Sequence, residues 1–146
     1  MYANDGFREL DRWECRALLV TVSVGRIVYT RQALPAVLPV NFCLDRDGTV
    51  VVRTSVSSEL ASAIDGAVVA FEADEVAAAA HSGWSVVALG PATLVTDPVE
   101  HARLLRTGPR SWAPAPWEVF VRIAQELVTG RRLVGGRTLD GVHPSS

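Results

Sequence analysis

A group of residues near the middle of the chain could together bind an anion. Arg53 interrupts the apolar stretch at residues 50–52. The hydroxyl residues Thr54, Ser57 and Ser58 follow it, just before a segment typical of a short helix. A guanidinium, hydroxyl groups and the unpaired N–H groups of a helix start are the groups that bind phosphate in proteins. The sequence therefore predicts an anion site here. The same residues would also be found if Arg53 paired with an acidic side chain and the hydroxyl residues only capped the helix.

Two further segments carry side chains that could line a ligand site. In one extended stretch, alternation places Val40 on one face and Pro39 and Asn41 on the other. The amide of Asn41 can both donate and accept hydrogen bonds, although this face could also be a rim exposed to solvent. Further along, Trp84 precedes Ser85, and a flat indole can either enclose a ligand or pack in a core.

The composition excludes the classes of catalysis that need an amine. All 14 basic residues are arginine, so a Schiff-base lysine, a lysine general base and a Walker-type phosphate loop are absent. The sequence has no GxSxG, HExxH or GxGxxG motif. The three histidines, His81, His101 and His143, are isolated, and surface roles are favoured for them. No side chain is therefore predicted to be catalytic.

No metal site is predicted either. Cys15 and Cys43 lie far apart without a CxxC motif, which indicates two free, reduced thiols. Glu72, Asp74 and Glu75 form a small acidic cluster, but no histidine stands at ligand spacing from it. A solvated strand end is the favoured interpretation of that cluster.

These residues must be positioned by a series of short strands. Asp11 and Glu14 form a capping-box pattern, and Cys15 begins an apolar stripe at helical spacing, so a first helix is predicted there. Strands are predicted at residues 26–30, 34–44, 49–55, 67–73, 83–89 with a bent continuation to 96, 119–123 and 127–133, and short helices at 57–64 and 99–106. Hairpin-type links without long parallel crossovers favour a mainly β (α+β) fold, a closed or split β-barrel with helices at its ends.

Length and charge set the remaining limits. A chain of 146 residues that is 49% hydrophobic is expected to form one domain, at residues 10–134, between a flexible tail at 1–9 and a polar tail at 135–146. The net charge of -2 argues against a nucleic-acid partner. No apolar run predicts a membrane span, and the charged start does not resemble a secretory signal, so we expect a cytoplasmic location.

The order and spacing of these segments resemble the pyridoxamine 5′-phosphate oxidase-like superfamily of flavin-binding split barrels. The similarity is greatest to its short actinobacterial branch, which is related to nitroimidazole-resistance proteins. It extends from about Leu10 to Leu133 and rests on the following motifs: the capped helix with Glu14, Gly25-Arg26, Leu38-Pro39-Val40-Asn41-Phe42, Val52-Arg53-Thr54, Ser58-Glu59-Leu60, Phe71-Glu72-Ala73-Asp74, Gly83-Trp84-Ser85-Val86 and Val128-Thr129-Gly130-Arg131-Arg132.

The resemblance implies a homodimer of six-stranded antiparallel split barrels with short flanking helices and an FMN at each end of the interface. It implies that the Pro39-Val40-Asn41 backbone approaches the isoalloxazine, and that Trp84 and Ser85 border the ring. It places the FMN phosphate at Arg53, Thr54 and Ser58, beside Ser57, and a contact from the partner subunit at Arg131. The flavin would carry the redox step, which agrees with the lack of a catalytic motif.

One departure from the family pattern leaves the cofactor open. Glu59 stands where the family commonly has a lysine, which removes a cation from the expected phosphate site. A deazaflavin and heme are the alternative cofactors. The resemblance thus predicts an FMN-dependent oxidoreductase of small organic substrates that works by hydride transfer. The alternatives are a non-catalytic dimer that binds or senses a flavin, deazaflavin or heme, and a cofactor-free structural or regulatory dimer.

Overall fold

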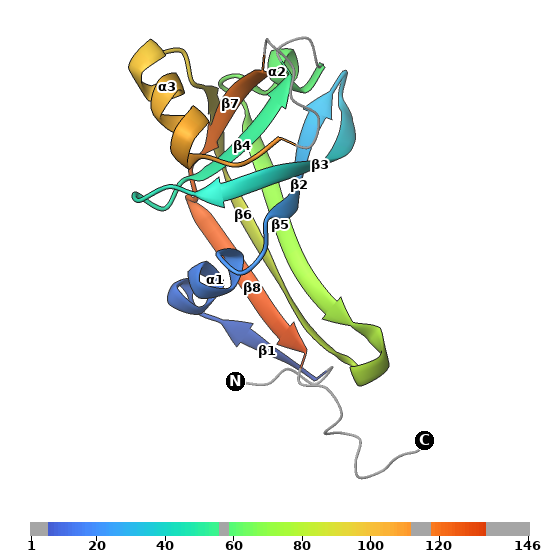
Figure 1. The fold of residues 1–146 in the computed structure, drawn as a ribbon. Helices are drawn as coiled ribbons and strands as arrows, with labels where there is room; N and C mark the ends of the chain where they lie inside the picture. The colour runs from blue at the N-terminus through green and yellow to red at the C-terminus, as the bar shows by residue number, and fades with distance from the viewer. Residues whose placement is uncertain (1–5, 56–58, 112–117, 134–146) are drawn as a thin grey trace.

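The computed structural model describes residues 6–55, 59–111 and 118–133, and these residues form a mainly β fold (Figure 1). The strands are β1 (Phe7–Leu10), β2 (Val24–Arg31), β3 (Leu34–Leu44), β4 (Val50–Ser55), β5 (Val68–Ala77), β6 (Ser82–Leu94), β7 (Glu118–Ile123) and β8 (Leu127–Leu133). The helices are α1 (Arg12–Leu19), α2 (Glu59–Ile64), the 3-10 turn η1 (Ala78–Ala80) and α3 (Pro98–Thr107). None of the helices in these ranges is long and apolar enough to cross a membrane.

Six of the strands close into an antiparallel barrel. They pair in the order β6, β5, β2, β3, β4 and β7, and β7 returns to the far end of β6 through the pair Ala92–Ile123. The predicted six-stranded antiparallel barrel is therefore confirmed. The other half of β6 pairs with β8, which in turn carries β1, so the sheet extends beyond the barrel (Figure 1).

The barrel interior is filled by alternate side chains of its strands. Ile27, Val52 and Phe71 are fully buried, and the rings of Phe42 and Phe71 meet edge to face at 4.7 Å. Gly25 is required beside this pair, because a Cβ at that position would lie 2.3 Å from the Phe71 ring. Strand β2 can therefore approach the aromatic core only without a side chain there.

Helix α1 begins with the predicted capping box. The Asp11 carboxylate accepts from the Glu14 backbone N–H at 2.8 Å, and the Asp11 N–H donates to the Glu14 carboxylate at 2.9 Å. Cys15, on the buried face of α1, is only 1% exposed and packs against the Gly130 backbone of β8. It acts as a small hydrophobic residue, as the helical stripe predicted.

A cluster of charges attaches α3 to the rest of the barrel. Arg103 on α3 and Arg122 on β7 both donate to Asp45, at 2.8 and 2.6 Å, and both also contact Glu100. Beneath α3, Leu104 packs with Val51 and Phe120 as a second small core on the outside of the barrel.

The start of the chain differs from the prediction. The segment 1–9 was predicted to be a flexible tail, but β1 pairs with β8 from Phe7 opposite Leu133 to Leu10 opposite Gly130. The Arg131 guanidinium lies 4.3 Å from the centre of the Phe7 ring, and this cation–π contact adds to the strand pairing. Strand β1 depends on a strand more than 100 residues away, so its local sequence gave little signal.

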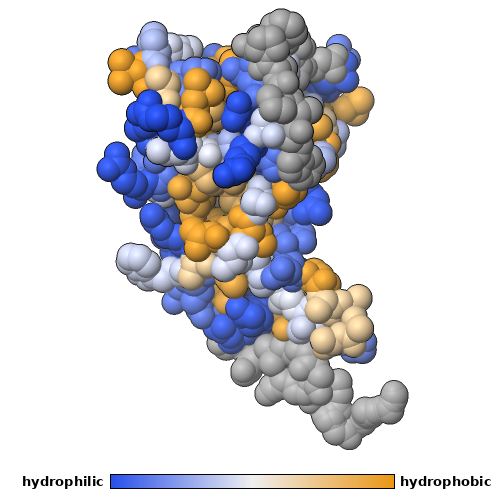
Figure 2. Space-filling view, viewed as in Figure 1, coloured by the Kyte–Doolittle hydropathy of each residue, from blue (hydrophilic) through white to orange (hydrophobic). Residues whose placement is uncertain are grey.

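Apolar side chains remain exposed over much of the surface. Figure 2 shows hydrophobic patches between hydrophilic ones on the side of the molecule viewed in Figure 1. The large exposed hydrophobic residues are Trp13, Val20, Leu34, Val37, Val68, Val76, Leu89, Val99, Leu105 and Leu127. Contiguous exposed apolar surface is typical of an interaction site.

Candidate functional site

The outward face of the sheet brings residues from five strands into two parallel rows. Residues paired directly across strands share a face, so the register defines each row. One row runs from Pro39 through Arg26, Glu72 and Val87 to Thr129. Its neighbour contains the pair Asn41–Val24 and the series Asp74, Ser85, Arg131. We call these ten residues the outer band.

The outer band gathers four of the residues predicted for the site. Pro39 and Asn41 lie at its β3 end, and Ser85 and Arg131 lie at its β6 and β8 end. Arg53 on β4 pairs directly with Asn41, so it continues the same face onto the next strand. The two sequence segments that suggested a pocket and a phosphate site are thus adjacent.

A charged trio occupies the middle of the band. One guanidinium nitrogen of Arg26 donates to Glu72 at 3.1 Å and to Asp74 at 3.3 Å. Burial and the neighbouring Asp74 raise the pKa of Glu72, the bonds from Arg26 oppose them, and the net result is a pKa of about 7. Glu72 therefore gains or loses its proton close to neutral pH.

A groove of 410 Å³ lies at the β8 end of the band. Ser85, Val87, Thr129 and Arg131 line it together with Leu10 and other residues of β1 and β8. It offers hydroxyl groups, the Arg131 guanidinium and, opposite Arg131 on β1, the Glu9 carboxylate, beside apolar side chains. Such a surface suits a ligand that has both a flat apolar part and an anionic part.

Arg53 is already engaged by protein groups. Its Nε donates to Glu118 at 2.8 Å, one terminal nitrogen donates to the Pro109 carbonyl at 3.3 Å, and the guanidinium lies 5.4 Å from the centre of the Phe120 ring. Glu118 also accepts from the Ser111 hydroxyl and is only 9% exposed. Glu118 is therefore the acidic partner that the alternative interpretation required for Arg53. Anion binding by Arg53 stays a prediction.

The remaining predicted residues are not on the outer band. Val40 and Trp84 are 5% and 6% exposed and belong to the core, on the face opposite Asn41 and Ser85. The Trp84 side chain packs in the core, and its place beside a flavin ring stays a prediction. Thr54 follows Arg53 on β4, so its side chain lies on the opposite face of the sheet. Ser57 and Ser58 lie outside the described residues, as does the side chain of Glu59.

Sequence reasoning did not assign a site role to Arg26, Glu72 or Asp74. Alternation alone shows that Glu72 and Asp74 share a face of their strand, but their position opposite Arg26 depends on the register between β2 and β5. Across the described ranges, the histidine, cysteine and acidic side chains form no group of three or more that could hold a metal ion.

The outer band has the groups that a flavin requires. The isoalloxazine ring is flat and apolar with a polar edge, and the phosphate end is anionic. Pro39, Val24 and Val87 supply apolar contact area, while Asn41 and Ser85 supply hydrogen-bonding groups. Arg131 supplies a cation at one end of the band. The residues present therefore fit a flavin nucleotide.

Comparison with known proteins decides the family. The family model described as pyridoxamine 5'-phosphate oxidase matches residues 11–132. The chain belongs to this family. The resemblance inferred from the motifs is thus confirmed, and the match covers strands β2 to β7 in full and β8 except for its last residue, while β1 lies before it.

Several proteins of actinobacteria are similar to this family member. The uncharacterized protein Rv0080 of Mycobacterium tuberculosis is 44% identical over 131 residues, which cover 86% of this chain and 85% of that protein. The FAD binding protein from Mycobacterium smegmatis has a TM-score of 0.77 and 34% identity, covering 88% of this chain and 100% of that one. A conserved protein of unknown function from Corynebacterium diphtheriae has a TM-score of 0.75 and 33% identity, covering 89% and 100%.

Proposed function

We propose that the protein is a flavin-dependent oxidoreductase of small organic substrates that works as a homodimer. The observation that carries this proposal is the outer band, where strand register gathers Pro39, Asn41, Ser85 and Arg131 on one face. Membership of the pyridoxamine 5'-phosphate oxidase family supports it.

The cofactor is a flavin nucleotide, with FMN as the first choice from the sequence. The Mycobacterium smegmatis relative is an FAD binding protein, so FAD is the direct competitor. When bound, the flavin supplies hydride transfer. The chain's own residues bind and orient it: Pro39 and Asn41 at the ring, and Arg131 at an anionic group or at the flavin of the partner subunit.

An apolar row beside the outer band supports the homodimer. Strand register aligns Leu127, Leu89, Ala70, Val28 and Val37 across five strands on the same outward face. Leu127 and Val37 are 57% and 62% exposed in the single chain. Burial of such a row between two copies is favourable by about 25 cal/mol per Å² of apolar area.

The first experiment is a visible spectrum of the purified protein, followed by titration with FMN and with FAD. Retention of either flavin, with a sedimentation mass twice 15.7 kDa, is expected. Oxidation of a chemical reductant that depends on an added enone then distinguishes an enzyme from a non-catalytic binder. A monomer that binds neither flavin would refute the proposal, and a heme or deazaflavin spectrum would replace its cofactor.

A variant pair tests the placement of the flavin. Arg131→Gln removes the guanidinium at the groove and is expected to weaken flavin binding by about tenfold, the effect of one charge-assisted hydrogen bond. Arg106→Gln is the control, because Arg106 is exposed on α3 and donates to the carbonyl of Ala102 within that helix. Equal affinities of the two variants would remove Arg131 from the site.

A further inference from the structure

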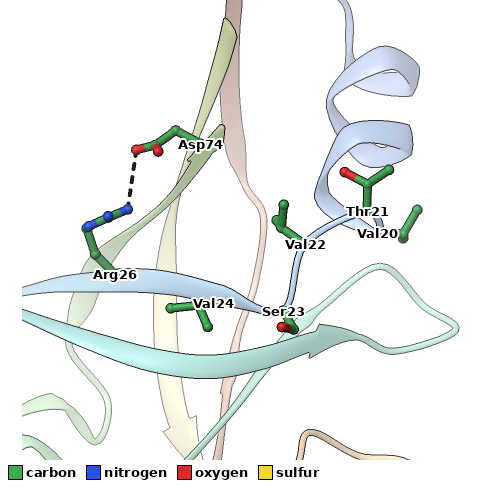
Figure 3. A pocket seen from close by; sticks show the side chains of 7 residues that line it. All are labelled: Val20, Thr21, Val22, Ser23, Val24, Arg26 and Asp74. Carbon is green, nitrogen blue, oxygen red and sulfur yellow. Dashed lines mark hydrogen bonds and ion pairs between the residues drawn. The ribbon is translucent and has the colours of Figure 1, made fainter. Parts of the chain in front are cut away.

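A second cavity adjoins the outer band where β2 begins. It has a volume of 510 Å³ and lies between the segment of residues 20–24, which joins α1 to β2, and the pair Arg26–Asp74 (Figure 3). We call it the β2 pocket; its lining residues are Val20, Thr21, Val22, Ser23, Val24, Arg26 and Asp74. The β2 pocket is a hollow largely open to solvent, and its volume is in the range of pockets that hold small organic ligands.

The two sides of the β2 pocket differ in chemistry. Figure 3 shows the side chains of Val22 and Val24 on one side and the bonded pair Arg26–Asp74 on the other. The Val20 side chain is 64% exposed and adds to the apolar side. A ligand that fills this space therefore meets valine methyl groups at one end and a guanidinium at the other.

Arg26 has donor capacity left for a ligand. A single terminal nitrogen makes both of its bonds, to Glu72 and to Asp74. Within the part of the chain that the structure describes, its Nε and second terminal nitrogen have no acceptor, and the side chain is 47% exposed. Because a guanidinium has five N–H donors, it can hold an oxygen atom without breaking the existing ion pairs.

The charges around Arg26 select against an ionised ligand. Its positive charge is compensated by Glu72 and Asp74, both within 3.3 Å of the same nitrogen. A ligand carboxylate would lie beside the carboxylate of Asp74, and a ligand cation would face Arg26. A neutral hydrogen-bond acceptor avoids both repulsions.

The pocket is placed where a substrate would meet the flavin of the proposed function. Arg26 pairs directly with Pro39, and Val24 pairs directly with Asn41. These are the residues expected at the isoalloxazine ring, so the pocket borders the ring position along the same face.

We propose that the β2 pocket binds a small uncharged molecule with a carbonyl oxygen, which Arg26 holds while the apolar part lies against Val22 and Val24. The further step, that this molecule is the substrate of the enzyme, rests on the proposed function. Binding itself does not need the flavin. The carboxylates of Glu72 and Asp74 position the guanidinium and give the preference for a neutral ligand.

Methyl NMR of the full chain with labelled valines tests this assignment with two probes that share a six-carbon ring, one neutral and one ionised. Cyclohexanone is expected to shift the methyl signals of Val22 and Val24, and cyclohexanecarboxylate is expected to bind at least about tenfold more weakly. Arg26→Gln should weaken cyclohexanone binding about tenfold, whereas Arg46→Gln, an exposed arginine of the β3–β4 turn, should not. Asp74→Asn should reduce the difference in affinity between cyclohexanone and cyclohexanecarboxylate.

The outcomes separate this proposal from the proposed function, because the titrations use both the flavin-free and the flavin-saturated protein. Specific binding of cyclohexanone to a chain that accepts no flavin would support the pocket and refute the oxidoreductase. Shifts away from Val22 and Val24, equal binding of the two probes, or undiminished binding by a folded Arg26→Gln variant would overturn the pocket assignment.

Discussion

Replacement of Glu72 by glutamine should change how the free energy of unfolding depends on pH. In the folded chain, burial and the neighbouring Asp74 raise the pKa of Glu72 from an ordinary value of 4.5 to about 7. The folded state therefore binds the proton more tightly than the unfolded state between these two pH values. Stability attributable to Glu72 is complete below about pH 4.5 and falls as the pH rises towards 7.

The size of the effect follows from the same shift. One pKa unit corresponds to about 1.4 kcal/mol, so the shift of Glu72 sets an upper limit of roughly 3 kcal/mol between pH 4.5 and pH 8. The charges of Arg26 and Asp74 both act on Glu72, and the Glu72 side chain is 23% exposed, so we expect about 1–2 kcal/mol. Glutamine cannot ionise and removes this contribution.

Urea unfolding at pH 5 and at pH 8 measures the effect. The wild type should lose about 1–2 kcal/mol more than Glu72→Gln between these pH values. Other acids act in the opposite direction, because arginine bonds hold the pKa of Asp45 below its usual range, so only the difference between the two proteins is informative. Glu75→Gln is the control, since Glu75 is exposed on the opposite face of β5. Parallel pH profiles for wild type and Glu72→Gln would refute the reasoning.

Three further changes have definite expected outcomes. Asp45→Asn weakens the bonds that Arg103 and Arg122 make to a carboxylate that is only 13% exposed, so it should lower the free energy of unfolding at pH 7 by about 2–3 kcal/mol. A change below about 0.5 kcal/mol in urea unfolding would contradict this. Gly130→Ala places a Cβ 2.5 Å from the Cys15 Sγ and should destabilise by about 1–3 kcal/mol, while added Cys15→Ala should recover part of that loss in the same assay. Arg53→Gln should weaken flavin binding about tenfold and also destabilise the chain by leaving buried Glu118 unpaired, whereas the double variant with Glu118→Gln should regain stability without regaining flavin affinity. Full recovery of both properties would assign Arg53 a structural role alone.

Local chemistry in the sequence was sufficient for most of the elements. The capping box of Asp11 and Glu14 located the start of α1, and the turn at Asp47-Gly48 joined β3 to β4, with Gly48 at a φ of +87°. Two-residue alternation identified Val40 as a core residue and Asn41 as a residue of the other face. These signals act over a few residues, so they can be read without knowledge of the partner strands.

The parts that sequence reasoning missed depend on distant partners. Arg53 could be assigned either to an anion or to an acid, and its partner Glu118 lies 65 residues further along the chain. The indole of Trp84 had two equivalent interpretations until its strand was placed against the core. Arg26 joined the site only through its register opposite Pro39 and Glu72. Register between strands is set by the complete barrel, and a single strand does not encode it.

Strand β6 takes part in two structures at once, and this limits how the protein can change. Its far end closes the barrel against β7, and its first half presents Ser85 to the outer band. A slip of one residue would turn Ser85 inward and Trp84 outward, and would also misalign the seam at Ala92. An insertion or deletion within β6 therefore cannot adjust ligand preference without opening the barrel. Variation in specificity among related proteins should instead accumulate as substitutions on its outward positions and as length changes in the segments that flank it.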